Sequence, residues 1–146
     1  MPPDTQSGRA DARLNTNPGD TEARRVVARR AYHEGQYDLA AWHYQTILDT
    51  NPEDLVSTLR LGWALRRQGR HSEELRSYQD ILNIQPSHTL ALSGEAIALA
   101  RLGHLKRSQN TLDALQVLAP TAPLTEMTIG VVEAIRGNED QSIAAL

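Results

Sequence analysis

The stretch YHEGQYDLAAWHYQTILDTNPED, which runs from Tyr32 to Asp54, contains two of the three signals that decide the fold. The glycine and the proline of this stretch recur along the chain at an interval of 34 positions. A small residue that lies shortly before the stretch recurs at the same interval. A fixed period of roughly 20–50 residues is typical of a solenoid, in which stacked repeats bury a continuous core. The glycines are Gly35, Gly69, Gly103 and Gly137, the prolines are Pro52, Pro86 and Pro120, and the small residues are Ala28, Gly62, Ala96 and Gly130.

Each of these signals has a physical reason. A glycine adopts the positive φ that often ends a helix, and a proline cannot continue one. A small residue lets two helices of a hairpin approach closely. The pattern predicts an all-α chain with helices at about 21–34, 37–50, 55–68, 71–84, 89–102, 105–118 and 123–136, and a short helix from 139.

The run from Tyr32 to Asp54 resembles the consensus of the tetratricopeptide-repeat (TPR) family from the end of one helix through the next. The resemblance implies a TPR solenoid of antiparallel helix pairs, with about three full repeats and a partial fourth. The repeats are expected at 21–54, 55–88 and 89–122, followed by a partial repeat or capping helices at 123–146. Family-like residues are Ala28, Ala40, Tyr44, Ile47 and Pro52, then Leu61, Gly62, Leu65, Tyr78, Ile81 and Pro86, then Leu92, Ala96, Leu99, Leu112, Leu115 and Pro120.

Four residues depart from the family pattern. Arg24 and Thr58 stand where the family prefers a large apolar residue, and Glu74 and Ser108 replace a small alanine. These departures are expected to weaken individual contacts without changing the period.

The first twenty residues are expected to be a flexible segment or the tail of a preceding repeat. The run ARLNTNPGD, at 12–20, aligns with TILDTNPED at 46–54. The chain is therefore expected to be cut from a longer array, with a short protein that has worn caps as the alternative.

The resemblance also implies that the first helix of each repeat lines a concave groove. We expect this groove to be rich in arginine and aromatic residues in its N-terminal half and apolar in its C-terminal half, and to bind a peptide with acidic and aliphatic residues. The alternative is that the arginines are solvated or only balance Glu22 and Glu34. The expected contact residues are Arg25, Arg29, Tyr32, His33, Leu59, Arg60, Trp63, Arg66, Arg67, Ile97, Arg101, Met127 and Val131.

The carboxylate clamp of chaperone-binding TPR domains is not expected. That clamp uses lysine, asparagine and arginine at five positions, which are occupied here by Arg25, Arg29, Arg60, Leu90 and Gly94.

Two tryptophans and the last helix are further candidate surfaces. Trp63 is expected on the groove face, either stacking on a ligand or packing in the core. Trp42 is expected to point outward, where it marks a second interface or covers a neighbouring repeat. The segment from Leu124 to Ile135 is apolar nearly all round, which favours self-association if nothing covers it.

Composition excludes several classes of function. The chain has no cysteine and a net charge of −3, so neither a thiolate metal site nor a strongly basic nucleic-acid surface is expected. Its five histidines form no metal-binding motif, and we found no phosphate-binding loop or catalytic triad. We therefore expect no enzyme, cofactor or metal. The start lacks the apolar core of a signal peptide, and we expect a cytoplasmic, bacterial protein without membrane insertion, with a fragment of an exported or membrane-anchored protein as the alternative.

Three functions agree with this reading. The first is a scaffold or adaptor segment of a larger protein that binds a partner in its groove. The second is a chaperone of the type III secretion kind. The third is a regulatory TPR segment of an enzyme such as a glycosyltransferase.

Overall fold

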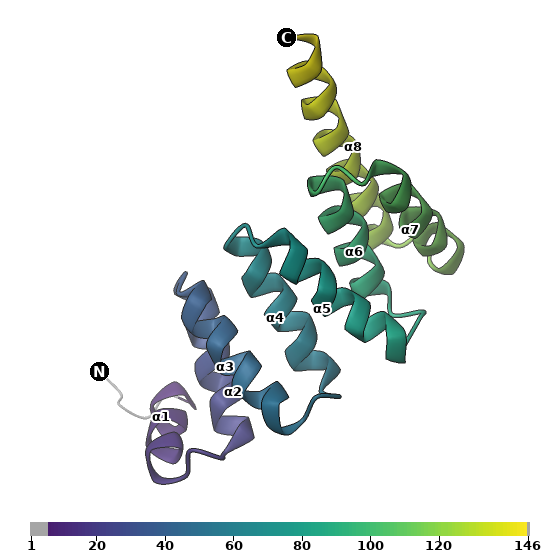
Figure 1. Cartoon of the computed structure of the whole chain (residues 1–146). Helices are drawn as coiled ribbons and strands as arrows, with labels where there is room; N and C mark the ends of the chain where they lie inside the picture. Colours follow the sequence, from purple (N-terminus) through teal and green to yellow (C-terminus); the bar gives the residue numbers. More distant parts are fainter. Residues whose placement is uncertain (1–5, 146) are drawn as a thin grey trace. The chain divides into compact units, whose positions relative to one another are not determined.

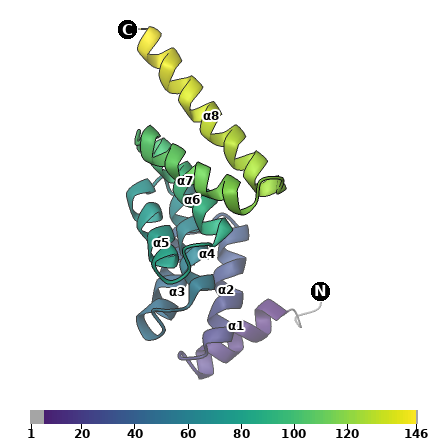
Figure 2. The same ribbon diagram turned by 90° about the vertical axis from the view of Figure 1, so that its right-hand side faces the viewer.

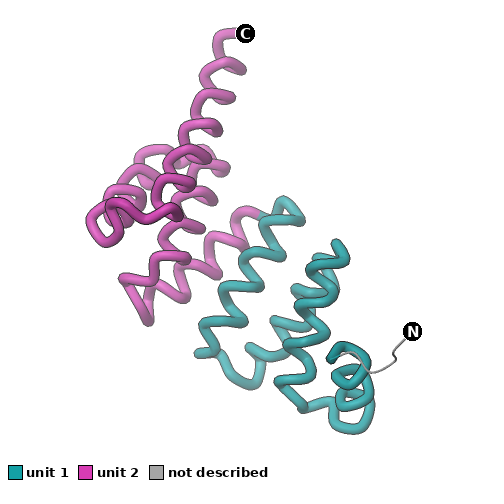
Figure 3. The backbone as a smooth tube through the Cα atoms, turned by 180° about the vertical axis from the view of Figure 1, so that it is seen from behind, with its two compact units in different colours: residues 1–70 teal, residues 71–146 magenta. Residues whose placement is uncertain are grey.

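The computed structural model describes residues 6–145, which contain eight α-helices and no strand (Figure 1). The chain divides into two compact units, residues 1–70 and 71–146, and each is described by itself (Figure 3). Unit 1 comprises α1 (Gln6–Thr16), α2 (Thr21–His33), α3 (Tyr37–Thr50) and α4 (Leu55–Arg67). Unit 2 comprises α5 (His71–Ile84), α6 (Thr89–Arg101), α7 (Leu105–Leu118) and α8 (Pro123–Ala144). The all-α prediction is confirmed, and the helices from α2 to α7 begin and end within one residue of their predicted bounds.

One capping position recurs with the repeat and starts three helices. Asp20 accepts a hydrogen bond from the amide of Ala23 at 3.0 Å, and Asp54 accepts one from the amide of Ser57 at 3.1 Å. His88 occupies the same position before α6 and caps it through a ring nitrogen. Each cap satisfies an amide that has no partner inside its helix, which fixes where that helix begins.

The turn glycines confirm three of the four predicted turns. Gly35, Gly69 and Gly103 have φ values of 78°, 71° and 79°, a conformation that favours glycine. The prediction of a turn at Gly137 was wrong, because α8 runs without interruption from Pro123 to Ala144. Residues 138–145 contain good helix formers and Ile143 as their only large apolar residue, so continuing the helix satisfies the backbone while folding back would bury little.

The core of unit 1 lies between successive helices, since α1 packs on α2, α2 on α3, and α3 on α4. Alanines at the helix contacts let the helices approach, and Tyr44 and Ile47 of α3 fill the space beside them. The core residues are Ala28, Ala31, Ala40, Ala41, Tyr44, Ile47, Leu61, Ala64 and Leu65.

The N-terminal segment differs from the expectation of a flexible stretch. Residues 6–16 form α1, which packs Ala10 against α2. Arg30 of α2 binds the carboxylate of Asp11 at 2.6 Å, and Arg13 binds Asp20 at 2.8 Å. These contacts order α1, whereas the part of the prediction that concerns residues 1–5 lies outside the described residues.

In unit 2, α6 lies in contact with α5, α7 and α8, and α7 also packs on α8. Figure 2 shows α8 lying beside α7 in its first half and extending past it in its second. The close contact of α5 with α6 depends on Gly94, because a Cβ atom there would lie 2.5 Å from the Tyr78 ring.

The four departures from the family pattern all make hydrogen bonds in the folded chain. Ser108 donates to the carbonyl of Ala96 at 2.7 Å, and Thr58 donates to the carbonyl of Asp54 at 3.0 Å. Glu74 is fully buried and accepts a hydrogen bond from Tyr78. Arg24 donates to the carbonyl of Pro18 at 2.7 Å. Buried polar groups with partners cost little, so the solenoid tolerates these substitutions.

Candidate functional site

Two adjoining cavities on unit 1 share the side chains of Arg29, Tyr44 and Arg60. The larger has a volume of about 250 Å³ and is lined by α2, α3 and α4; the smaller has a volume of about 70 Å³. We call the two together the arginine groove. Its lining residues are Glu22, Arg25, Arg29, Tyr32, His33, Tyr44, Val56, Ser57, Arg60 and Trp63.

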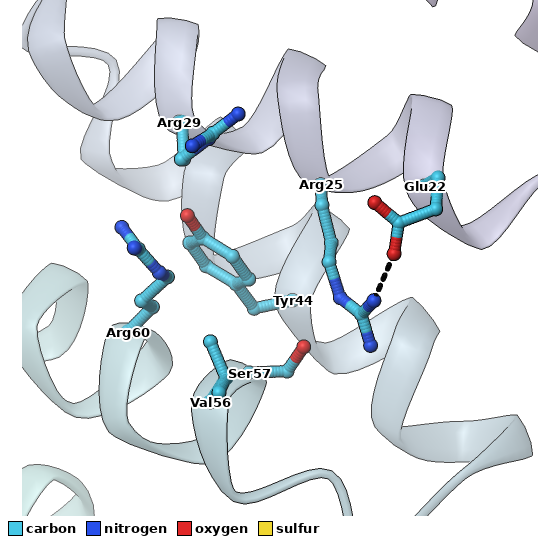
Figure 4. Close-up of a pocket in the computed structure, with 7 residues that line it drawn as sticks. All are labelled: Glu22, Arg25, Arg29, Tyr44, Val56, Ser57 and Arg60. Atoms are coloured by element: carbon cyan, nitrogen blue, oxygen red, sulfur yellow. Dashed lines mark hydrogen bonds and ion pairs between the residues drawn. The ribbon is translucent and has the colours of Figure 1, made fainter.

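Arg29 and Arg60 give the groove its positive charge. Figure 4 shows the hydroxyl end of Tyr44 between these two side chains, Arg29 from α2 and Arg60 from α4. Within residues 6–145, neither arginine forms an ion pair. The groove therefore presents two positive charges that no described carboxylate neutralises.

Tyr44 forms the floor between the two arginines. It is only 1% exposed, and burial raises the pKa of its hydroxyl, although the charge and hydrogen bond of Arg60 oppose this. The neutral phenol leaves both guanidinium charges undiminished. Sequence analysis named Tyr44 only as a family-like residue of the repeat and did not include it among the groove contacts, although it lines both cavities.

Arg25 lies in the same cavity, but its charge is neutralised within the chain. Its guanidinium pairs with the carboxylates of Glu22 and Asp54, and the Glu22 contact is drawn in Figure 4. Burial alone would raise the pKa of Asp54, but hydrogen bonds from Arg25 and Ser57 outweigh it and hold the pKa below its usual range. For Arg25, the alternative of a balanced surface arginine describes the geometry better than that of a ligand contact.

Known proteins resemble this chain in fold. No family model matches the chain. Superkiller protein 3 of Saccharomyces cerevisiae is 31% identical over 99 residues, which are 67% of this chain and 7% of that protein. A tetratricopeptide repeat protein from Parabacteroides merdae has a TM-score of 0.79 and 16% identity over 93% of this chain and 54% of its own. This chain has the tetratricopeptide-repeat fold.

Two further structures share the TPR fold with this chain. MamA (AMB-1) has a TM-score of 0.72 and 21% identity, over 80% of this chain and 63% of MamA. The TPR domain of Arabidopsis OM64 has a TM-score of 0.70 and 14% identity, over 78% of this chain and 94% of that domain. The chain thus spans a small part of Superkiller protein 3 and less than two thirds of MamA.

Aromatic residues surround the smaller cavity of the arginine groove. The Arg60 guanidinium lies 5.9 Å from the centre of the Trp63 ring, and Tyr32 and His33 line the same cavity. Arg67, which was also expected in the groove, donates instead to the hydroxyl of Tyr37 at 2.7 Å. Arg66 is half-buried and does not line either cavity.

The remaining predicted contacts divide into buried and exposed residues. The predictions for Leu59 and Ile97 were wrong, because these side chains are 7% and 2% exposed and serve the apolar core. In unit 2, Arg101 and Met127 are exposed, and Val131 is half-buried against the core. Helical spacing predicts which residues share one face of a helix, but it does not show which of them a neighbouring helix covers.

The second tryptophan points outward, as expected. Trp42 is 58% exposed and lies under the guanidinium of Arg24, 5.5 Å from the ring centre. Arg24 also contacts the ring of His43 at 3.1 Å, so this part of α3 forms a compact polar cluster beside α1 and α2.

Neither a metal site nor a membrane span is found in the described part of the chain. Residues 6–145 hold no group of three or more His, Cys, Asp or Glu side chains that could bind a metal ion. None of their helices combines the length and apolar character that crossing a bilayer requires.

Proposed function

We propose that this chain is a protein-interaction module that binds an acidic peptide segment of a partner in the arginine groove. The observation that supports it is the pair of charges on Arg29 and Arg60, which flank Tyr44 at an open cavity and lack carboxylate partners in residues 6–145. The module would serve as a scaffold or adaptor segment, because the groove presents binding groups and no catalytic constellation.

The chemistry of the groove favours a carboxylate-bearing peptide. A guanidinium offers a planar fork of donors that matches a carboxylate, and arginine, tyrosine and tryptophan are frequent energetic centres of protein interfaces. The exposed Val56 at one end and Trp63 at the other provide apolar contacts for aliphatic side chains of the same peptide. We therefore expect acidic residues flanked by aliphatic residues in the bound segment.

The test is a binding titration by fluorescence anisotropy with a labelled peptide of alternating Glu and Leu. The Arg29→Ala/Arg60→Ala variant should weaken binding about 100-fold or more, since each of the two lost hydrogen bonds to a charged group contributes about 1.5–3 kcal/mol. A peptide with Gln in place of Glu should bind the wild type as weakly as the Glu peptide binds the variant. Added salt should weaken the binding of the Glu peptide only.

The matched control is Lys106→Ala/Arg107→Ala, which removes the same charge from two exposed residues of α7. It should bind the Glu peptide as the wild type does. Equal loss in both variants would reduce the effect to net charge, and equal binding by all three proteins would refute the arginine groove. A pull-down with the same three proteins then identifies a partner that depends on the groove.

A further inference from the structure

One face of α8 is open where the equivalent faces of α2 and α6 are covered. Gly130 follows Ala28 and Ala96 in the 34-residue register, and both alanines are 0% exposed, beneath α3 and α7 respectively. Gly130 is exposed, and a Cβ atom built on it would meet nothing within 4 Å. Among residues 6–145, no helix therefore packs on α8 as α3 packs on α2.

The opposite situation holds at α1. The alignment of residues 12–20 with residues 46–54 makes α1 the counterpart of α3. Whereas α3 packs between α2 and α4, α1 packs on α2 alone among the described helices of unit 1. A cavity of about 320 Å³ lies beside it. The cavity is lined by Gln6, Arg9, Ala10, Arg13, Glu22 and Val26.

The register of the repeats shows what this cavity lacks. Beside α3, the equivalent cavity is lined not only by α3 and α4 but also by Glu22, Arg25 and Arg29 of α2. Beside α1, the lining residues come from α1 and α2 only, and no helix of residues 6–145 lines this cavity in the way that α2 lines the cavity beside α3. The open face of α1 thus has the position of a helix that lacks the first helix of its hairpin, and α8 has the position of such a first helix.

We propose that two copies of this chain associate head to tail, with α1 of one copy packed on the open face of α8 of the other. The two helices would form the hairpin that α2 and α3 form within one chain.

Charge complementarity supports this pairing. Within the chain, Arg24 of α2 contacts His43 of α3 at 3.1 Å. In the same register, Glu126 of α8 takes the place of Arg24, and Arg9 of α1 takes the place of His43. Both side chains are exposed, so the association would bring a carboxylate against a guanidinium. Glu133 adds a second negative charge to α8.

A second contact transfers in the same way. Ser108 of α7 donates to the carbonyl of Ala96 in α6 at 2.7 Å. The residues in register are Gln6 of α1 and Gly130 of α8. The Gln6 amide is a donor and can reach for the carbonyl of Gly130, where the absence of a side chain permits the close approach.

The predicted contact is heterologous, because different surfaces meet. Each association leaves one α1 face and one α8 face uncovered, so assemblies grow with concentration unless they close into a ring. Sedimentation velocity over a concentration series measures this growth directly.

The first test uses charge reversal at the two faces. Arg9→Glu and Glu126→Arg each place like charges in contact, and each should raise the dissociation constant about ten-fold or more. An equimolar mixture of the two variants should associate again, because the α1 face of one variant and the α8 face of the other then carry opposite charges. Association that survives both single variants, or a mixture that stays apart, would overturn the proposal.

The second test blocks the close approach without disturbing the single chain. Gly130→Leu should abolish association, while the monomer becomes more stable because leucine favours a helix and the site is open. Gly137→Leu, in the same helix and equally open, should leave association intact. A wild-type chain that stays monomeric at every concentration would overturn the proposal and assign both faces to other helices, such as those of an adjoining repeat.

Discussion

Asp54 has two roles that join unit 1 together. Its carboxylate caps α4 through the amide and hydroxyl of Ser57, and it pairs with Arg25 on α2. Asp20 occupies the same capping position before α2, but its ion-pair partner, Arg13, is exposed. The same residue type in the same register therefore carries a half-buried pair in one repeat and a more exposed pair in the other.

We predict that Asp54→Ala lowers the free energy of unfolding by about 1–2 kcal/mol, because the cap is lost and Arg25 keeps only Glu22 as a partner. Urea denaturation measures the loss. Asp20→Ala is the control and should cost less, since Arg13 stays solvated. Equal losses in the two variants would show that the half-buried pair adds nothing beyond the cap.

His43 makes stability depend on pH. Burial lowers the pKa of His43 below its ordinary value of 6.5, and the charges of Arg24 and Arg30 lower it further, with Asp11 opposing them. Below pH 6.5, His43 of the unfolded chain binds a proton, whereas His43 of the native chain has a lowered pKa and stays neutral to a lower pH. The contribution to stability is thus present above pH 6.5 and is lost as the pH falls through the native pKa.

We predict that the free energy of unfolding of the wild type falls between about pH 7 and pH 5, and that His43→Gln falls less over this range. The Gln amide oxygen can still accept from Arg24, so the variant should remain folded. The carboxylates with lowered pKa values, Asp11, Asp20 and Asp54, lose their contribution only as the pH falls below their ordinary 3.8. Parallel pH profiles for the two proteins would contradict the assignment.

One helix contact of unit 2 depends on a glycine. Gly94 of α6 lies against the ring of Tyr78 of α5, and Tyr78 also hydrogen-bonds the buried Glu74. In contrast, Gly130 of α8 faces open space. Two helical glycines of one unit thus stand in opposite environments.

We predict that Gly94→Ala destabilises the chain by about 1–3 kcal/mol, because the added methyl group forces the Tyr78 ring to move. Gly130→Ala should stabilise it by about 0.5–1 kcal/mol, the ordinary gain in a helix. Thermal or urea unfolding at a concentration where the chain is monomeric compares them. The same sign for both substitutions would refute the packing difference.

At the scale of the molecule, the chain consists of two units, each with helix contacts of its own. Within each unit, helices pack only on helices one or two places away along the chain, and each unit has a core of its own in the described residues. Such solenoids have a stability that is close to a sum of repeats and their interfaces, so a local defect has a local effect.

We predict that hydrogen exchange in Gly94→Ala is faster chiefly at the amides of α5 and α6, while α2 and α3 keep most of their protection. Mass spectrometry of the exchanged protein resolves the two units. A uniform loss of protection over all helices would show instead that the chain unfolds as one cooperative body.

The helix bounds were predictable because their signals are local. A capping residue such as Asp54 or a turn residue such as Gly35 acts on the backbone within a few positions, so a 34-residue period repeats both the signal and the structure. Gly137 shows the limit of this reasoning. It keeps the interval, but the residues after it bring no apolar face that would stabilise a second helix.

The sequence alone established the all-α repeat, its phase and the face of α2 and α4 on which arginines gather. Which arginines keep their charge was decided by the folded chain, because Asp54 lies 29 positions from Arg25 yet forms an ion pair with it. Arg29, one turn further along α2, meets no carboxylate in the described structure and lies instead beside Tyr44. Helical spacing determines which side chains share a face, whereas neutralisation and burial depend on atoms that folding brings from other helices.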